Sequence, residues 1–176
     1  TGLGIHPGSG SQEPIVRRCR SFGNGQDGLY VCWRVKHGLF EQNEIRGNDR
    51  CGISIGHKDT DNLFRNNTVI GNGTAGVLFR QEAEAMGAHR NVFENNRILD
   101  NGVKSTGGSA QAAILIQGHH HDLVFRGNTI GNTTTASPAT VGIRVSPNTQ
   151  GLMTEQNRFQ NVVRDVEPQQ ATGSSR

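Results

Sequence analysis

Short apolar strands separated by glycine- and asparagine-rich turns recur along almost the whole chain. Five of these strands begin with Gly or Ala and then alternate apolar with variable positions, over residues 28–31, 52–55, 76–79, 113–116 and 142–145. Because successive side chains of a strand point to opposite faces, one apolar set turns to a common side. We predict that this set stacks as an inner aliphatic column, made of Leu29, Val31, Ile53, Ile55, Val77, Phe79, Ile114, Ile116, Ile143 and Val145.

Asparagines recur in two series at matching intervals. The first series is Asn43, Asn67, Asn96, Asn128 and Asn157, with Cys19 in the matching place of the first unit. The second is Asn24, Asn48, Asn72, Asn101, Asn132 and Asn161, at spacings of 24, 24, 29, 31 and 29 residues. Asn tolerates the left-handed backbone of tight turns, and amides stacked one strand spacing apart can hydrogen-bond along the stack. The spacing predicts a repeated coil whose loops lengthen in the later units.

An aromatic residue precedes most members of the first asparagine series by three positions. These residues are Phe40, Phe64, Phe93 and Phe125, and Val16 takes the place in the first unit. Because they share one register with the asparagines, we expect them to stack inside the coil as core residues. This placement argues against a role for them in stacking on sugars.

These units resemble the right-handed parallel β-helix repeat family of the pectin-lyase-like superfamily, in the pattern N-x-(I/V/F)-x-x-N-x-x-x-x-G-(I/V)-x-(I/V), over residues 2–165. The resemblance implies an all-β, right-handed parallel β-helix of about six coils. We expect the domain to occupy residues 1–166 and residues 167–176 to be a disordered or artificial tail. Since residues 1–5 read as a coil strand that starts at once, the chain is expected to be a fragment of a longer solenoid or to receive its cap from elsewhere.

Composition agrees with a narrow solenoid. Only 32% of the 176 residues are hydrophobic, while 24 are glycines, so the core must be thin and the turns many. The net charge of +3 is too small and dispersed to indicate nucleic acid, and the longest apolar run, Ala112–Ile116, is too short to span a membrane. Three cysteines without metal-type spacing are expected to be buried free thiols.

Three insertions lengthen the later coils. They lie at residues 80–89, 102–111 and 133–140, and they flank the same predicted strands on both sides. Loops that depart from a basic repeat often gather on its functional face. We therefore expect a groove over this sheet, floored by the outward residues Tyr30, Ser54, Leu78, Leu115 and Arg144. The alternative is that the loops are tolerated surface insertions.

Polar, chemically reactive residues follow these strands in four coils. The segments are 33–37, 57–61, 80–82 and 119–122. Because equivalent positions in adjacent coils lie about 4.8 Å apart, the segments are expected to meet in space. The candidate catalytic residues are His57, Lys58, Arg80, His119 and His120, and the candidate substrate-binding residues are Tyr30, Trp33, Arg34, Lys36, His37 and Arg144.

The residue types suit removal of the C5 proton of a uronic acid. Such chemistry needs a cation to neutralise the substrate carboxylate and a base to take the proton. His57, His119 or His120 is the candidate base, and Lys58 or Arg80 is the candidate carboxylate clamp. The alternative is that these residues are ordinary solvated turns.

A cluster of acidic residues raises the question of a metal. Asp59, Asp61, Glu82 and Glu84 lie on adjacent predicted turns and offer oxygen ligands for Ca²⁺. Lys58 and Arg80 lie nearby, so salt bridges are the alternative. The run His119–His121 offers nitrogen ligands, although adjacent histidines point in different directions. No cofactor is certain, and Ca²⁺ remains a candidate.

The sequence favours a carbohydrate-active β-helix that binds an acidic polysaccharide, as a polysaccharide lyase or a C5-epimerase, in a secreted, periplasmic or cell-surface location. The Asp-rich and G-H-G motifs of polygalacturonase-type hydrolases and the D-P-H element of mannuronan epimerases are not found. The alternative is a non-catalytic module of a tailspike, adhesin or surface protein. The expected partners are the polysaccharide and either the remainder of a longer chain or further copies of this one, with no nucleic acid and no membrane.

Overall fold

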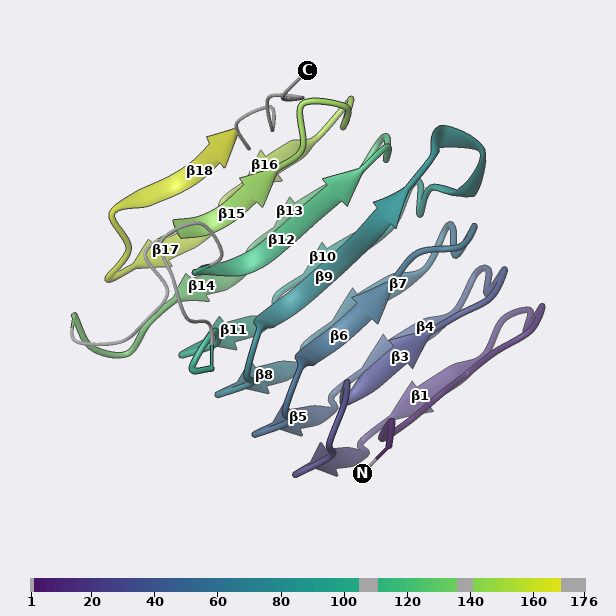
Figure 1. The fold of residues 1–176 in the computed structure, drawn as a ribbon, viewed down its shortest axis with the longest axis horizontal. Helices are drawn as coiled ribbons and strands as arrows, with labels where there is room; N and C mark the ends of the chain where they lie inside the picture. Colours follow the sequence, from purple (N-terminus) through teal and green to yellow (C-terminus); the bar gives the residue numbers. More distant parts are fainter. Residues whose placement is uncertain (1, 105–110, 136–140, 169–176) are drawn as a thin grey trace, which may run out of the picture.

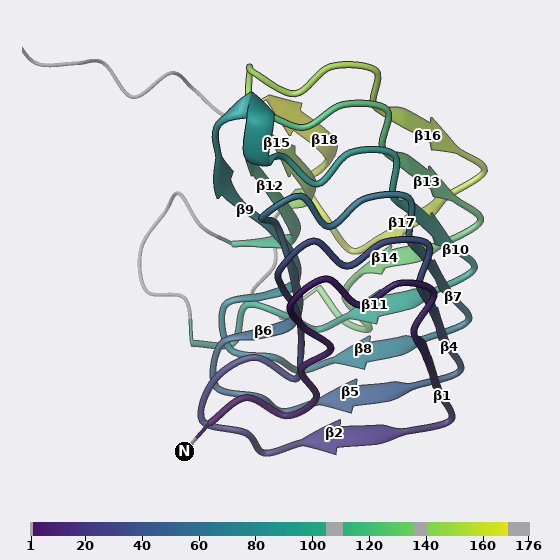
Figure 2. The same cartoon turned by 90° about the vertical axis from the view of Figure 1, so that its right-hand side faces the viewer.

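The repeated strands form three parallel sheets wound around one narrow core (Figures 1 and 2). The computed structural model describes residues 2–104, 111–135 and 141–168. Each coil contributes one strand to each sheet, and the three sheets have six strands apiece. The predicted right-handed parallel β-helix of about six coils is therefore confirmed.

The strands are named here in the order in which the chain passes the sheets. Sheet 1 contains β1 (Ile15–Arg17), β4 (Leu39–Glu41), β7 (Leu63–Arg65), β10 (Val92–Glu94), β13 (Val124–Arg126) and β16 (Met153–Glu155). Sheet 2 contains β2 (Arg20–Phe22), β5 (Glu44–Arg46), β8 (Thr68–Ile70), β11 (Arg97–Leu99), β14 (Thr129–Gly131) and β17 (Arg158–Gln160). Sheet 3 contains β3 (Leu29–Val31), β6 (Cys51–Ile55), β9 (Ala75–Glu82), β12 (Ala112–Gly118), β15 (Val141–Val145) and β18 (Arg164–Pro168).

The asparagine series are hydrogen-bonded ladders at the corners of the coil. In the first series, Asn43 Nδ2 donates to Asn67 Oδ1 at 3.0 Å, and the backbone N–H of Asn43 donates to the same oxygen at 3.0 Å. In the second, Asn48 Nδ2 donates to Asn72 Oδ1 at 2.8 Å. Each buried amide thus satisfies the backbone of one coil while it pairs with the next, which sets the register between coils.

A third, shorter ladder escaped the sequence analysis. Asn62 Nδ2 donates to Asn91 Oδ1 at 3.0 Å, and the N–H of Gly38 donates to Asn62 Oδ1 at 2.8 Å. This ladder stands at the corner where the chain enters sheet 1. Its two asparagines lie 29 residues apart, the spacing shared by both neighbouring series, and this was the signal that could have revealed it.

The core contains the two predicted columns. Phe40, Phe64, Phe93 and Phe125 stack with ring centroids 4.6, 4.4 and 5.1 Å apart, and all four are fully buried. The inner aliphatic residues of sheet 3 pack against this ladder. The Phe side chains are thus core residues, as predicted. A binding site must therefore be formed by side chains on the outer surface of the sheets.

Two further expectations are modified by the structure. The three cysteines are free, but only Cys51 is buried, whereas Cys19 and Cys32 are partly exposed. Strand β18 continues to Pro168, so it includes the first two residues of the predicted tail, Glu167 and Pro168. No helix in the described part of the chain is long and apolar enough to cross a membrane.

Candidate functional site

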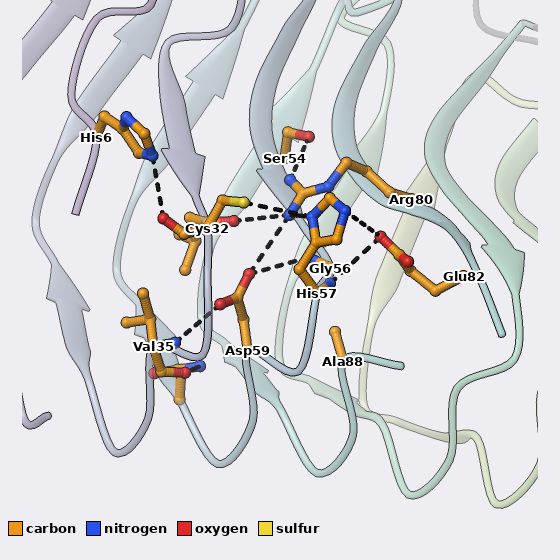
Figure 3. Close-up of polar contacts among 12 residues, drawn as sticks. His6, Cys32, Val35, Ser54, Gly56, His57, Asp59, Arg80, Glu82 and Ala88 are labelled. Atoms are coloured by element: carbon orange, nitrogen blue, oxygen red, sulfur yellow. Dashed lines mark hydrogen bonds and ion pairs between the residues drawn. The ribbon is translucent and has the colours of Figure 1, made fainter. Parts of the chain in front are cut away.

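The turn that leaves sheet 3 gathers polar side chains from three adjacent coils. Strand β3 contributes Tyr30. The residues after β3 contribute Cys32, the turn after β6 contributes His57 and Asp59, and the extended strand β9 contributes Arg80 and Glu82 (Figure 3). Strands β3, β6 and β9 are neighbours in the sheet, which is why residues about 24 positions apart meet. We call these six residues the His57 network.

His57 stands at the centre of this network. Its Nδ1 lies 3.3 Å from Arg80 Nη2 and 3.3 Å from Cys32 Sγ, and its Nε2 lies 3.3 Å from Glu82 Oε1. A guanidinium can only donate hydrogen bonds, so Nδ1 must accept and Nε2 must carry the proton that faces Glu82. The indole of Trp33 stacks on the imidazole with centroids 5.4 Å apart. His57 is thus held in one orientation by contacts to both ring nitrogens and to the ring face.

Arg80 crosses the outer surface of sheet 3 from its own strand to the two preceding ones. Its Nη1 donates to Ser54 Oγ at 3.0 Å and its Nη2 donates to the Val31 carbonyl at 2.9 Å. The guanidinium also lies over the Tyr30 ring, 4.5 Å from its centroid. These contacts hold the positive charge of Arg80 beside His57. The Arg80 side chain is 14% exposed.

Asp59 anchors the turn that carries His57. The carboxylate is fully buried and accepts the N–H groups of Val35 at 2.9 Å and Gly56 at 3.2 Å. Its Oδ2 also lies 3.4 Å from Arg80 Nη2. Burial raises the pKa of Asp59 to about 6, against the opposing effect of the backbone donors and Arg80. The residue therefore ties turn and guanidinium together.

Gly56 is a small residue on which this packing depends. A Cβ at this position would lie 2.9 Å from Arg80 Nε and 2.9 Å from Glu82 Oε1. Any larger side chain would push both charged groups away from His57. Sequence reasoning missed this glycine, as well as Cys32 and His6, whose ring packs edge-on against Tyr30 at 5.2 Å.

His120 does not join the network, although it was a predicted base. It is buried, its Nδ1 accepts the Ala88 N–H at 2.9 Å, and its Nε2 faces the carbonyls of Gln117 at 2.6 Å and Arg80 at 3.1 Å. Burial lowers the pKa of His120 to about 4. Both nitrogens are thus engaged inside the protein, and the histidine braces the β9–β12 turns.

The other predicted residues lie apart from His57. Lys58 is exposed, and its N–H donates to the Met86 carbonyl at 2.8 Å. His119 is partly exposed, and its N–H donates to the Glu82 carbonyl at 2.9 Å. Arg144 lies on β15, two strands from β9 in sheet 3, and forms an ion pair with Glu167 at 2.7 Å. Arg34 and His37 are exposed on the turn after β3, where Lys36 is partly exposed.

The predicted Ca²⁺ cluster does not form. Asp59 is turned inward to Arg80, Asp61 pairs with Arg90 at 2.7 Å, and Glu82 faces His57. Glu84 is exposed at the start of the short helix η1 (Glu84–Met86). Across the described residues, no group of three or more His, Cys, Asp or Glu side chains could hold a metal ion. Of the salt bridges expected with Lys58 and Arg80, the structure contains the one between Asp59 and Arg80.

The predicted groove floor is only partly open. Tyr30, Ser54, Leu78, Leu115 and Arg144 do form one register row across sheet 3. However, Ser54 is buried beneath Arg80, and Leu115 is buried against a small apolar cluster with Ala75 and Ala112. Residues 105–110 and 136–140 of the flanking loops lie outside the described residues. The exposed part of the site is the edge at Trp33 and His57.

A pH-dependent stability follows from buried His120. Its pKa is about 4 in the folded chain against an ordinary 6.5, so between these values only the unfolded chain binds the proton. Stability should therefore fall as pH decreases through this window, by up to about 3 kcal/mol. Denaturant unfolding from pH 7 to pH 4 of the wild type and of His120→Gln checks this. Asp59 opposes the trend, because its raised pKa stabilises the folded chain as pH falls.

Comparing the wild type with His120→Gln separates the pH dependence due to His120 from that due to Asp59. Asp59 contributes equally to both, so the difference in unfolding free energy between wild type and His120→Gln should shrink as pH falls from 6.5 toward 4. Parallel pH profiles for the two chains would contradict a neutral, buried His120.

Comparisons with known proteins agree with the fold. Residues 2–84 match the family model described as the right-handed β-helix region. No curated protein sequence matches the chain significantly. The predicted resemblance is confirmed at the level of the fold, a right-handed parallel β-helix.

Several solved structures are similar to this chain. The A-module of the Azotobacter vinelandii mannuronan C-5 epimerase AlgE4 superposes with a TM-score of 0.77 at 19% identity, over 98% of this chain and 46% of that one. The AlgE6 A-module of the same organism superposes with a TM-score of 0.75 at 23% identity, over 91% of this chain and 39% of that one. A double mutant of the periplasmic alginate epimerase AlgG superposes with a TM-score of 0.69 at 15% identity, over 94% of this chain and 41% of that one. At these identities the likeness shows the fold, and the chain spans less than half the length of these structures.

Proposed function

Because this chain is a right-handed parallel β-helix similar in fold to mannuronan and alginate epimerases, we propose that it acts on an acidic, uronate-containing polysaccharide at the His57 network. The reaction is removal of the C5 proton, completed as a C5-epimerisation or as a lyase elimination. The periplasmic location of one similar protein supports a site of action outside the cytoplasm. One observation carries the proposal: a carboxylate-oriented imidazole lies 3.3 Å from a guanidinium at an exposed edge.

The chemistry assigns roles to Arg80, His57, Glu82 and Tyr30, four of the six members of the His57 network. The Arg80 guanidinium neutralises the substrate carboxylate, which makes the adjacent C5 proton more acidic. His57 takes that proton through Nδ1, and Glu82 stabilises the imidazolium that results. Tyr30 is the second group beside Arg80 with a transferable proton, and burial raises the pKa of its hydroxyl, so it remains a proton donor. Return of a proton to the opposite face of C5 gives epimerisation, and loss of the 4-O group gives elimination.

Trp33 supplies the platform for the sugar. Its side chain is 48% exposed, while one face rests on His57. An exposed indole next to the base can stack on an adjacent pyranose ring and hold the chain over His57. Arg34, Lys36 and His37 follow on the same turn and are proposed to contact neighbouring uronate carboxylates.

The test compares two histidines that each face a carboxylate. The wild type, His57→Asn and His121→Asn are incubated with alginate, pectate and glycosaminoglycans; His121 lies 2.8 Å from Asp122, outside the network. C5 inversion is followed by NMR and elimination by the absorbance of unsaturated products. Turnover should fall by about 100-fold or more in His57→Asn, the usual contribution of a positioned base, and persist in His121→Asn. Asn tolerates the φ of +50° at position 57, so the turn is preserved.

A non-catalytic binding module is the second candidate. Arg80 already donates to Ser54 and Val31 and approaches Asp59, so it must rearrange before it can hold a substrate carboxylate. That engagement suits a rigid rod in which Arg80 is structural. Glycan binding without turnover, unchanged in His57→Asn, would establish this candidate and reject the enzymatic one.

A further inference from the structure

Cys32, which the proposed uronate chemistry does not use, forms a relay of three side chains with His57 and Glu82. Its Sγ lies 3.3 Å from His57 Nδ1, and His57 Nε2 lies 3.3 Å from Glu82 Oε1 (Figure 3). A nucleophile, a base and a carboxylate that orients the base are the parts by which proteins activate thiols. The three residues come from three adjacent coils, so the arrangement exists only in the folded helix.

The electrostatics make the base necessary. Burial raises the pKa of the Cys32 thiol, and the Arg80 charge and the Tyr30 hydroxyl act in the opposite direction. The resting group is therefore the thiol, and the nucleophilic thiolate forms only when a base takes its proton. The single lone pair of His57 Nδ1 is shared between Arg80 Nη2 and Cys32 Sγ, each 3.3 Å away, so Nδ1 takes the thiol proton once the guanidinium N–H turns from it.

We propose that Cys32 is a thiol-modification site that reacts with small disulfides, with His57 as its base. The Sγ–H proton passes to His57 Nδ1 and Sγ attacks one sulfur of R–S–S–R. The S–S bond of the reagent breaks, and the departing RS⁻ takes the proton from the imidazolium. The products are the mixed disulfide at Cys32 and the free thiol RSH, so the exchange needs no further oxidant.

The other cysteines serve as internal standards. Cys19 is also partly exposed, but its Sγ donates to the Arg17 carbonyl at 3.3 Å, an acceptor that cannot carry a proton away. Cys51 is buried, and burial raises the pKa of its thiol to about 12. The chain therefore offers one activated thiol, one exposed thiol without a base and one thiol that reports unfolding.

The site has a regulatory consequence that rests on the proposed function. A group attached to Sγ would occupy the side of His57 that must take the C5 proton and would crowd Arg80. Modification should therefore stop turnover, and reduction should restore it.

The test measures modification rates with hydroxyethyl disulfide, followed at each cysteine by peptide mass spectrometry. In the wild type, Cys32 should react about tenfold or more faster than Cys19, because a positioned base commonly contributes about 100-fold or more. His57→Asn should slow Cys32 to about the Cys19 rate, and Glu82→Gln should slow it less. Unreacted Cys51 shows that each variant is folded.

Several outcomes would overturn the proposal. Equal rates at Cys19 and Cys32 in the wild type would show that the relay does not activate the thiol. An unchanged Cys32 rate in His57→Asn, with Cys51 still protected, would show that the contact is packing alone. The readout needs no polysaccharide, so activation of Cys32 without any turnover would sustain this proposal while rejecting the proposed function.

Discussion

Replacing Asn67 with alanine is expected to lower the free energy of unfolding by about 3 to 5 kcal/mol, because buried groups that lose their partners cost about 1 to 3 kcal/mol each. Asn67 Oδ1 accepts both the N–H and the Nδ2 of Asn43, each at 3.0 Å. Its own Nδ2 donates to the Phe40 carbonyl at 2.8 Å and to Asn96 Oδ1 at 3.0 Å. Alanine would leave both buried donors of Asn43 without this acceptor. Urea unfolding followed by circular dichroism measures the effect.

The adjacent asparagine is the matched control. Asn66 is exposed and has a φ of +55°, so Asn66→Ala should cost only about 1 to 2 kcal/mol for the left-handed backbone. If Asn67→Ala destabilises the chain no more than Asn66→Ala, the ladder contributes little to stability, and its register-setting role would need another explanation.

Phe93→Ala is expected to cost a similar amount, about 3 to 5 kcal/mol, as large-to-small changes of buried Phe do. The ring lies 4.4 Å from Phe64, 5.1 Å from Phe125 and 5.7 Å from Phe79. Truncation would open a cavity in the middle of the stack, and neighbouring coils tied by backbone ladders cannot collapse to fill it. The midpoint of denaturant unfolding measures the loss.

An exposed phenylalanine provides the comparison. Phe22 is 57% exposed and contacts Arg46, so Phe22→Ala should cost less than about 1 kcal/mol, the scale of an exposed cation–π contact. Comparable losses at positions 22 and 93 would indicate that the aromatic ladder is not the core of the helix.

The fold could be predicted because its determinants repeat. An apolar residue at every second position, an asparagine at each corner and a phenylalanine three residues earlier are local rules, and in-register stacking repeats each of them four to six times. Even the missed ladder of Asn62 and Asn91 obeys the same rule. It escaped notice because it has only two members.

The site could be predicted only as far as its location. The sequence placed His57, Arg80 and Glu82 on turns of neighbouring coils, and they do meet. It did not distinguish His57 from His120, since both follow a strand in a polar run. The turn around His120 directs its ring inward, where burial lowers its pKa to about 4, whereas His57 stays at the surface against Trp33.

For the acidic residues too, the sequence predicted the location but not the orientation of the side chains. Asp59, Asp61, Glu82 and Glu84 look alike as ligands in the sequence, but Asp59 pairs with Arg80, Asp61 pairs with Arg90 and Glu82 faces His57. Asp59 turns inward because Val35 and Gly56 offer N–H donors there, and Gly56 leaves the space for Arg80 and Glu82. Such choices depend on backbone dihedrals and on neighbours from other coils, which no local pattern contains.

By itself, the sequence determined the parallel β-helix, its two long asparagine ladders, its core and the edge that carries the polar residues, because these follow from periodicity. Only the tertiary structure decided that Arg80 lies across three strands, that Asp59 and His120 are buried, and that Cys32 and Glu82 face the two nitrogens of His57. The physical reason is that contacts between adjacent coils set the direction and burial of each side chain. Direction and burial in turn decide which residues lie close enough to exchange protons.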